Sequence, residues 1–298
     1  MAFAAAPLAF LAVTPFAQNP VPPVPVPVSV SIGRACLFDG ATGLPATPAA
    51  FLTRARASQV VYAGEKHDSA AHHRAQRDLL EALQLADPTA SAAFEMLYTT
   101  QQGALDDYLG GTTDAAGFQG AVDWPKTWGF PFPLYQPIFE LLRATSQKGA
   151  ALNVPKKIVS KVSFQGLESL TPEERAFVPE GFQTPTDGPY LEMLAETYRA
   201  HGGDPAETVG FGRFKDAMSL WNEGMAAALA RFLSAGPTGP VVVVAGAFHA
   251  YAAGIPDGVS RRVPGVRQLS VVLLDRADCP ARLDPADLAL TADYYWAP

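Results

Sequence analysis

The sequence is poor in charge and in cysteine, and both shortages exclude classes of protein. Only 17% of its 298 residues are charged, and the formal net charge is -7. Nucleic-acid binding needs clustered Lys and Arg against the phosphates, so we expect no nucleic-acid partner. The chain has two cysteines and no C-x-x-C-H attachment motif, so any haem would be held noncovalently.

Several catalytic motifs are also missing. The chain has no G-x-S-x-G elbow, H-E-x-x-H pair, Walker loop or Rossmann glycine fingerprint. The common hydrolase, nucleotidase and dehydrogenase signatures therefore give no guidance. The two cysteines, Cys36 and Cys279, lie near the two ends of the folded part. A disulfide between them and two buried thiols are both compatible with this spacing.

The N-terminal residues have the composition of an export signal. Residues 1–17 are apolar except for Thr14, and this run is too short to span a bilayer securely. A disordered apolar leader is the alternative. Residues 18–34 are rich in proline and favour an extended spacer. We expect an exported protein of the periplasm or cell envelope.

Apolar strands and helices alternate through residues 35–298, which predicts one α/β domain. This alternation favours a mostly parallel sheet with helices on both faces. The polar, helical stretch at about 156–235 is predicted to be a cap inserted into that domain. Strands are expected at 35–38, 58–64, 90–96, 149–154, 241–246 and 269–274, and helices at 48–57, 68–85, 100–109, 134–147, 171–178, 189–201 and 206–234.

Polar side chains follow three of these strands at the points where the strands end. Glu65 and His67 follow the second strand, Glu95 lies at the end of the third, and His249 follows the strand at 241–246. Each histidine comes three residues after a strand-ending glycine. Ligands in open α/β sheets bind beyond the carboxyl ends of the strands, so we expect these four side chains to form one site.

The chemistry of these four residues allows two roles. Glu65 and Glu95 could serve as general bases, metal ligands or partners that orient a histidine. The imidazoles of His67 and His249 could bind a metal or move protons near neutral pH. We therefore predict that the same four residues serve either in catalysis or in metal binding. The alternative for Glu95 is a buried salt bridge to Arg74 or Lys66.

Two further features have competing interpretations. Residues 124–133 form an aromatic, proline-rich loop that suits a flat apolar ligand, and that would equally serve as a hydrophobic cover over the sheet edge. His201 lies at a glycine-rich helix end, where we expect a surface residue without a role in the site.

Segments along the chain resemble the ChaN family of haem-binding uptake proteins. The stretch Val61-Tyr-Ala-Gly-Glu-Lys-His-Asp, followed by His73-Arg-Ala-Gln, is similar to the opening motif of that family. Further similar segments cover about residues 36–274. They are Asp39-Gly-Ala-Thr-Gly, Phe94-Glu-Met, residues 128–137, Leu152-Asn-Val-Pro, Trp221-Asn-Glu-Gly-Met-Ala, and Gly246-Ala-Phe-His with Gly254-Ile-Pro.

The resemblance implies an exported α/β protein that binds haem during iron acquisition. It also implies a fold shared with the TraB, Tiki and erythromycin-esterase group, in which paired Gly-x-x-His motifs and a nearby Glu carry catalysis, sometimes with a divalent metal. The family's iron ligand is understood to be a tyrosine whose position no motif fixes here. The candidate cofactor residues are His67, His73, Tyr135, His249 and Tyr251.

The site residues and the family resemblance are compatible with two functions. The favoured one is a haem-binding envelope protein that takes part in haem and iron acquisition. The alternative is a hydrolase that uses Glu65, His67, Glu95 and His249 for acid/base chemistry or with a metal ion such as Mn, Co, Zn or Fe. The expected partner is haem or another small molecule. A homodimer and an association with envelope uptake machinery stay open.

Overall fold

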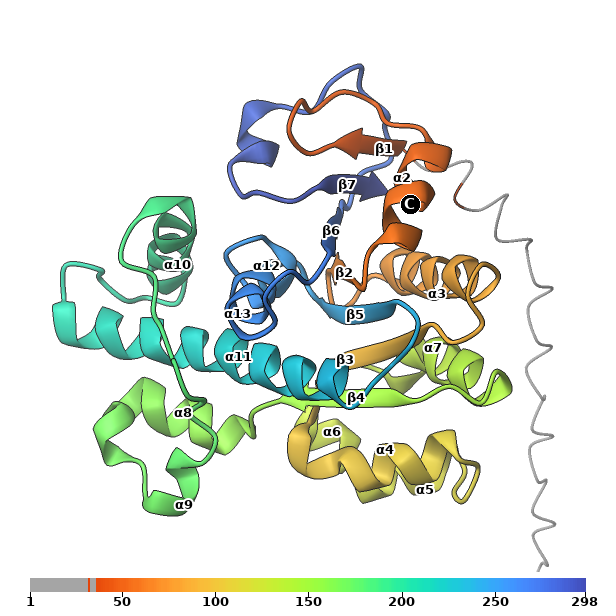
Figure 1. The fold of residues 1–298 in the computed structure, drawn as a ribbon. Coiled ribbons are helices and arrows are strands. Elements are labelled where there is room, and N and C mark those ends of the chain that lie inside the picture. The colour runs from red at the N-terminus through yellow and green to blue at the C-terminus, as the bar shows by residue number, and fades with distance from the viewer. Residues whose placement is uncertain (1–31, 33–35) are drawn as a thin grey trace, which may run out of the picture.

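The computed structural model describes residue 32 and residues 36–298. The predicted signal segment and nearly all of the spacer lie outside these residues. Within the described part, the strands form one seven-stranded sheet in the order β1-β7-β6-β2-β5-β3-β4 (Figure 1). Only the β1–β7 pair is antiparallel, so the predicted α/β fold with a mostly parallel sheet is confirmed. The strands are β1 (Cys36–Asp39), β2 (Val60–Glu65), β3 (Ser91–Tyr98), β4 (Gly149–Asn153), β5 (Val241–Gly246), β6 (Gln268–Leu273) and β7 (Tyr294–Ala297).

Helices connect most of the strands, and short 3-10 turns add to them. The α-helices are α2 (Pro48–Ala57), α3 (Ala70–Gln84), α4 (Gln102–Leu109), α5 (Ala115–Ala121), α6 (Trp124–Thr127), α7 (Phe132–Ala144), α8 (Lys156–Gln165), α9 (Pro172–Arg175), α10 (Gly188–Ala200), α11 (Thr208–Ser234), α12 (Ala247–Ala250) and α13 (Ile255–Arg262). The 3-10 turns are η1 (Thr99–Gln101), η2 (Leu167–Ser169) and η3 (Pro285–Leu288).

Several elements have no counterpart among the expected helices and strands, and β7, α5 and α13 show why. Strand β7 has only four residues, too few to show an alternating pattern, and it is placed by pairing with β1 and β6. Helix α5 has two glycines in seven residues, which lowers its intrinsic helix propensity. Helix α13 is short and polar outside its buried face. Tertiary packing, rather than local preference, decides these three elements.

The centre of the sheet is buried on both faces. In β5, Val242 and Val244 belong to a core cluster with α2, α3 and α7, whereas Val241 and Val243 belong to a second cluster with α11 and α13. This is why the strand has a continuous β-branched run instead of an alternating one. Each fully buried valine contributes roughly 1.5 kcal/mol or more. The strand ends beside β5 are thereby held at fixed positions.

The helical segment that was predicted to be a cap divides into two parts. Helices α8, α9 and α10 lie beyond the carboxyl ends of the strands, on the left of Figure 1, and pack in small clusters of their own. The second half of α11 instead packs on the sheet, where Met225 and Leu229 join the second core cluster. The boundaries of the inserted cap, at about 156–235, stay a prediction.

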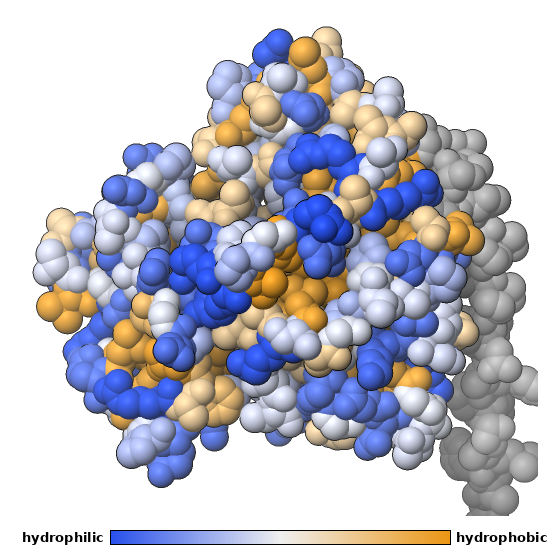
Figure 2. Space-filling view, in the orientation of Figure 1, coloured by the Kyte–Doolittle hydropathy of each residue, from blue (hydrophilic) through white to orange (hydrophobic). Residues whose placement is uncertain are grey.

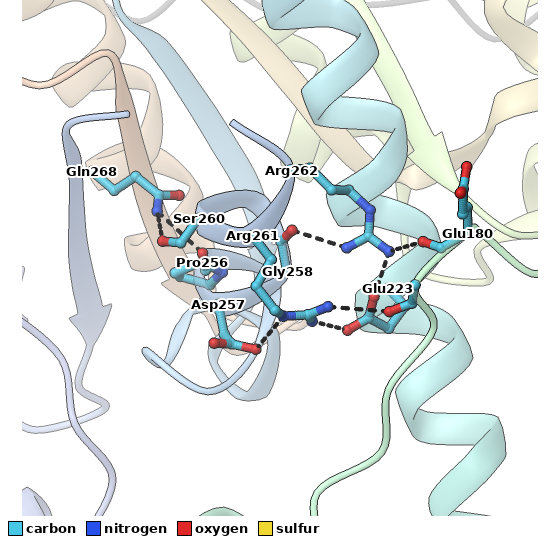
Figure 3. A network of polar contacts seen from close by, with 10 residues as sticks. Glu180, Glu223, Pro256, Asp257, Gly258, Ser260, Arg261, Arg262 and Gln268 are labelled. Atoms are coloured by element: carbon cyan, nitrogen blue, oxygen red, sulfur yellow. Dashed lines mark hydrogen bonds and ion pairs between the residues drawn. The ribbon is translucent and has the colours of Figure 1, made fainter. Parts of the chain in front are cut away.

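Two tertiary links hold the periphery to this core. Cys36 and Cys279 form a disulfide that joins β1 to the segment after β6. Glu223 of α11 is buried and pairs with both Arg261 and Arg262 of α13 (Figure 3). Among the residues that the structure describes, no helix is long and apolar enough to cross a membrane.

Candidate functional site

The end of β2 places Glu65 beside His67. Glu65 is 2% exposed, and its Oε1 accepts a hydrogen bond of 2.7 Å from Nδ1 of His67. This bond leaves Nε2 as the ring nitrogen of His67 that can act on a ligand. A Cβ on Gly64 would lie 2.6 Å from the Cβ of Ala250, so glycine lets α12 pack against the strand end.

Glu95 joins β3 to the neighbouring β5. Its Oε2 accepts a 2.6 Å hydrogen bond from the N–H of Gly246, and its Oε1 lies 3.2 Å from Nε2 of His249. Burial would raise the pKa of Glu95, but the His249 and His67 rings and the Gly246 N–H lower that pKa to about 2. Glu95 is therefore an ionised carboxylate at the centre of the site.

A polar chain continues behind His249 into α11 and α10. The Oδ1 of Asn222 lies 2.6 Å from Nδ1 of His249, and the Asn222 amide donates a 2.6 Å hydrogen bond to the hydroxyl of Tyr190. That hydroxyl donates in turn to the carbonyl of Phe248. Both nitrogens of the His249 ring thus face oxygen acceptors, and the ring orientation is fixed.

Gly246, the first residue of the second Gly-x-x-His motif, lies next to His67 of the first motif. A Cβ there would be 2.8 Å from Cε1 of His67 and 3.6 Å from Oε2 of Glu95, so both side chains approach the same glycine. Burial lowers the pKa of His67, but the hydrogen bond to Glu65 and the charges of Glu95 and Asp68 outweigh it. The pKa of His67 therefore lies above its ordinary value.

Two of the residues predicted to bind the cofactor, His73 and Tyr135, lie behind His67. The carbonyl of His67 faces Nε2 of His73 at 3.1 Å and accepts a 3.2 Å hydrogen bond from the Tyr135 hydroxyl. Tyr135 is 0% exposed and His73 is 2% exposed. Burial raises the pKa of Tyr135 far above its ordinary value, and the Glu65 carboxylate adds to this. In this structure both side chains contact the backbone of His67 from the interior.

The aromatic loop contributes both to the core and to the site. Trp124 and Phe132 are buried in the core, as the interpretation of a hydrophobic cover expects. Trp128 and Phe130 instead lie beside the His67 ring, at centroid distances of 4.7 and 5.1 Å. Two buried polar atoms in this area, Nε1 of Trp128 and Oε2 of Glu65, have no hydrogen-bond partner among the described residues.

Tyr251 follows His249 at the end of α12 and is partly buried. Its ring packs against the core cluster formed with α11 and α13. Of the two tyrosines considered as iron ligands, Tyr251 is the more exposed, because Tyr135 is fully buried. His201 is exposed at the end of α10, as expected for a residue outside the site.

The structure also separates the alternatives for Glu95 and for a metal. Glu95 pairs with His249, while Lys66 pairs at the surface with Asp275 at 3.0 Å and with Asp68 at 3.6 Å. The predicted salt bridge from Glu95 to Arg74 or Lys66 is therefore wrong. Among the described residues no group of three or more His, Cys, Asp or Glu could hold a metal ion. The metal role predicted for Glu65, His67, Glu95 and His249 has no support here, although the four side chains do gather in one place.

Sequence reasoning did not assign Asn222, Tyr190 or Gln76 to the site, although Asn222 and Gln76 lie in two of the family-like segments. The amide of Gln76 donates a 2.7 Å hydrogen bond to the carbonyl of Ala63 in β2, and its Oε1 lies 3.0 Å from Nδ1 of His73. Asn222 does leave a trace in the sequence, because it is a polar residue within the apolar second half of α11. Tyr190 leaves none, since its position depends on how α10 packs.

The fold and the paired strand-end motifs define an α/β protein with one polar site at the carboxyl edge of its sheet. A family model described as "Haem-binding uptake, Tiki superfamily, ChaN" matches residues 51–259, well over half of the chain. The chain belongs to that family. No curated protein gave a match.

The solved structure of ChaN from Campylobacter jejuni supports the same fold. ChaN of Campylobacter jejuni, described with cofacial haem binding, is similar at a TM-score of 0.68 and 19% identity, over 88% of this chain and 96% of that one. A mutant of the erythromycin esterase EreC in its open conformation matches at a TM-score of 0.47 and 14% identity, over 76% of this chain and 72% of that one. The type III effector HopBA1 matches at a TM-score of 0.44 and 13% identity, over 82% of this chain and 89% of that one.

Proposed function

We propose that this protein binds haem at the strand-end site, as an exported protein of the cell envelope that takes part in haem and iron acquisition. The observation that carries the proposal is the setting of His67. Its Nδ1 is held by Glu65, its side chain is 32% exposed, and aromatic rings lie against it. An oriented imidazole beside apolar rings suits a flat porphyrin with a central iron.

The residues of the site fit a haem in three respects. The hydrogen bond to Glu65 uses Nδ1 of His67, which leaves Nε2 as the candidate iron ligand. Trp128 and Phe130 would hold the porphyrin by apolar contact. Tyr251 supplies a phenol on the same edge of the sheet, next to His249. When bound, the haem supplies an iron centre that takes imidazole or phenolate ligands.

The other residues predicted for the site hold its backbone in place. His73 and Tyr135 contact the carbonyl of His67 and keep its backbone in place. Glu95 and His249 tie the end of β5 to β3. We therefore assign positioning roles to these four, and ligand contact to His67 and Tyr251.

A homodimer is part of this proposal. ChaN of Campylobacter jejuni is described with cofacial haem binding. Two haems stack face to face most simply at an interface between two copies of one chain. A surface site, rather than an enclosed cavity, suits such an arrangement. Light scattering of the purified protein with and without haemin tests it, and a monomer that binds haemin without associating contradicts it. An envelope uptake partner would exchange haem with this site.

Haemin titration tests the proposed ligand. We expect a shifted Soret band and saturable binding by the wild-type protein. The variants His67→Ala and Tyr251→Phe should each weaken binding at least tenfold or change the band position, because each removes a candidate iron ligand. His201→Ala is the matched control and should bind as the wild type does. Absence of saturable binding by the wild type rejects the proposal.

A hydrolase is the second candidate, favoured by one observation. The buried Glu95 carboxylate, the His249 ring and the Asn222 amide form a chain in which each group orients the next. Oriented carboxylate and imidazole pairs serve in acid/base catalysis. Elemental analysis of protein purified without chelators separates the two candidates. Stoichiometric metal without porphyrin absorbance, together with hydrolysis of model esters that fails in Glu95→Gln, would favour the hydrolase.

A further inference from the structure

A cleft runs along β4, the edge strand of the sheet, and His67 is not among the residues that line it. It has a volume of about 1180 Å³ and follows the edge strand β4 between α4 and the last turns of α11. Its lining includes the first residues of β3 and β4, whereas the proposed haem site lies beyond their carboxyl ends. In Figure 1 this region is at the lower right, where α11 ends above β4. The two sites therefore share no residue.

The lining on the α11 side is largely apolar. Ala150 of β4 and Ala228 of α11 are buried, and Phe232 packs against the same core cluster. Figure 2 shows an apolar area near the middle of this face of the molecule, with hydrophilic residues around it. This side of the cleft can accept a short hydrocarbon body.

A buried hydroxyl in the lining has no partner. Ser91, the first residue of β3, is 2% exposed, and its Oγ makes no hydrogen bond within the described part of the chain. Side chains alternate along a strand, so Ser91 lies on the same face as Ala93, whose cluster includes α11. Buried hydroxyls are nearly always hydrogen-bonded, and a ligand oxygen would supply the missing partner.

Two cations in the same lining have no ion pair, and the carboxylate of Asp106 lines the cleft as well, where it accepts a hydrogen bond from Gln102. Lys148 directly precedes β4, and Arg231 lies in the last turns of α11. Neither side chain has an ion pair or hydrogen bond among the residues that the structure describes. In a protein of net charge -7, two unpaired cations in one cleft are an attractive site for an anion. Arg143 lines the cleft too, but it is held near Glu140 and over the ring of Tyr108.

The edge of β4 is closed to a peptide strand. The amide of Gln102 donates to the carbonyl of Gly149 at 2.9 Å, and its Oε1 accepts from the N–H of Ala151 at 2.8 Å. This side chain takes the place of a neighbouring strand and blunts the edge. An added β-strand would have to displace it, so a small molecule is the better occupant of the cleft.

We propose that this cleft is a second ligand site, for a small organic anion with a short apolar body. The carboxylate or phosphate group of the ligand would be held by Lys148 and Arg231 and would accept a hydrogen bond from the hydroxyl of Ser91. The apolar body would lie on Ala228 and Phe232. This site does not depend on the proposed haem site, because the two share no residue.

Calorimetric titration of the wild-type chain with octanoate and with octyl phosphate tests the inference. We expect saturable binding of at least one of them at one site per chain, and the preferred probe separates a carboxylate ligand from a phosphate monoester. Equal binding of 1-octanol, which has the same body without the charge, would overturn the inference. So would the absence of saturable binding of both anions.

Variants locate the bound anion. Arg231→Gln and Lys148→Gln should each weaken binding about tenfold, since each removes a charged hydrogen-bond donor. Arg199→Gln makes the same change at an exposed position on α10 and should leave the affinity unchanged. Ser91→Ala removes a hydroxyl that has no partner in the protein, so the variant should fold, and it should also bind more weakly. Full affinity in all three cleft variants overturns the proposal.

The variant His67→Ala separates this site from the haem site. It should keep the octanoate affinity of the wild type, even where haemin binding is lost. Loss of octanoate binding in His67→Ala would place the anion at the strand-end site and overturn the inference.

Discussion

Oε1 of Glu95 in β3 lies 3.2 Å from Nε2 of His249, which follows the neighbouring strand β5. The two strands are far apart in the sequence. The other oxygen of Glu95 accepts the N–H of Gly246, the residue that begins the second Gly-x-x-His motif. One carboxylate therefore holds both ends of that motif. The motif is positioned by a residue from outside it.

Replacing Glu95 by Gln should destabilise the protein and change its response to acid. The pKa of Glu95 falls from an ordinary value of 4.5 to about 2 on folding. Its ionised form therefore contributes stability that is fully present above pH 4.5 and is lost as the pH falls toward 2. The shift corresponds to about 3 kcal/mol. Urea unfolding between pH 2.5 and 7 should show a flatter pH dependence in Glu95→Gln.

Glu192→Gln is the control for this measurement. Glu192 is exposed on α10, so this substitution should change the free energy of unfolding by less than about 0.5 kcal/mol. If Glu95→Gln kept the stability and the acid response of the wild type, the carboxylate would not have the role given to it here.

Replacing Glu65 by Gln should lower the pKa of His67. Burial lowers this pKa in the wild type, and the hydrogen bond to Glu65 helps to raise it above 6.5. The raised pKa contributes stability that is present below pH 6.5 and is lost as the pH rises through the folded pKa. A titration of the ring resonances by NMR measures the change. An unchanged pKa of His67 in the variant would contradict the assignment.

Much of the site location could be predicted from sequence, because it depends on where strands end. The run Val241 to Val244 is apolar and β-branched, and the glycines at 64 and 246 end two adjacent strands. Parallel pairing then brings Glu65 and His249 to one edge of the sheet without any further information.

The partners within the site could not be predicted in the same way. The contact of Glu95 with His249 spans 154 positions in the numbering, from 95 to 249, and no local pattern encodes it. Tyr135 was expected at the ligand, but it is buried, because helix α7 turns it inward toward the carbonyl of His67. Side-chain direction on a helix depends on which face packs, and the face is decided by the whole fold.

Replacing Gly246 by Ala should displace the His67 ring while leaving the backbone intact. The backbone at Gly246 has φ -60° and ψ 150°, which alanine adopts freely. The new Cβ would lie 2.8 Å from Cε1 of His67, so the ring has to move. We expect a stability loss of about 1–3 kcal/mol and at least tenfold weaker haemin binding.

Gly212→Ala is the matched control for the glycine substitution. A Cβ at Gly212 meets nothing within 4 Å, and the residue lies inside α11. Alanine should therefore raise the free energy of unfolding by roughly 0.5–1 kcal/mol and leave haemin binding unchanged. Equal haemin affinity in both variants would mean that the His67 ring does not contact the ligand.

Replacing Glu223 by Gln should loosen the segment around residues 180–181, which leads to α10. The Glu223 carboxylate pairs with Arg261 and Arg262, which also donate hydrogen bonds to the carbonyls of Gly181 and Glu180 (Figure 3). Glu223 is 5% exposed, so losing its charge leaves Arg262 without a carboxylate partner and Arg261 with Asp257 alone. We expect a loss of about 2–4 kcal/mol and faster proteolysis near residues 180–181.

The exposed pair of Lys126 and Asp123 offers the comparison for Glu223. Its side chains are 84% and 53% exposed, so Lys126→Gln should leave the free energy of unfolding nearly unchanged. Limited proteolysis with mapping of the first cut gives the second readout, because only the Glu223 variant should expose the segment at 180–181. Similar stability and similar cleavage in the two variants would show that the buried network does not hold this segment to α13.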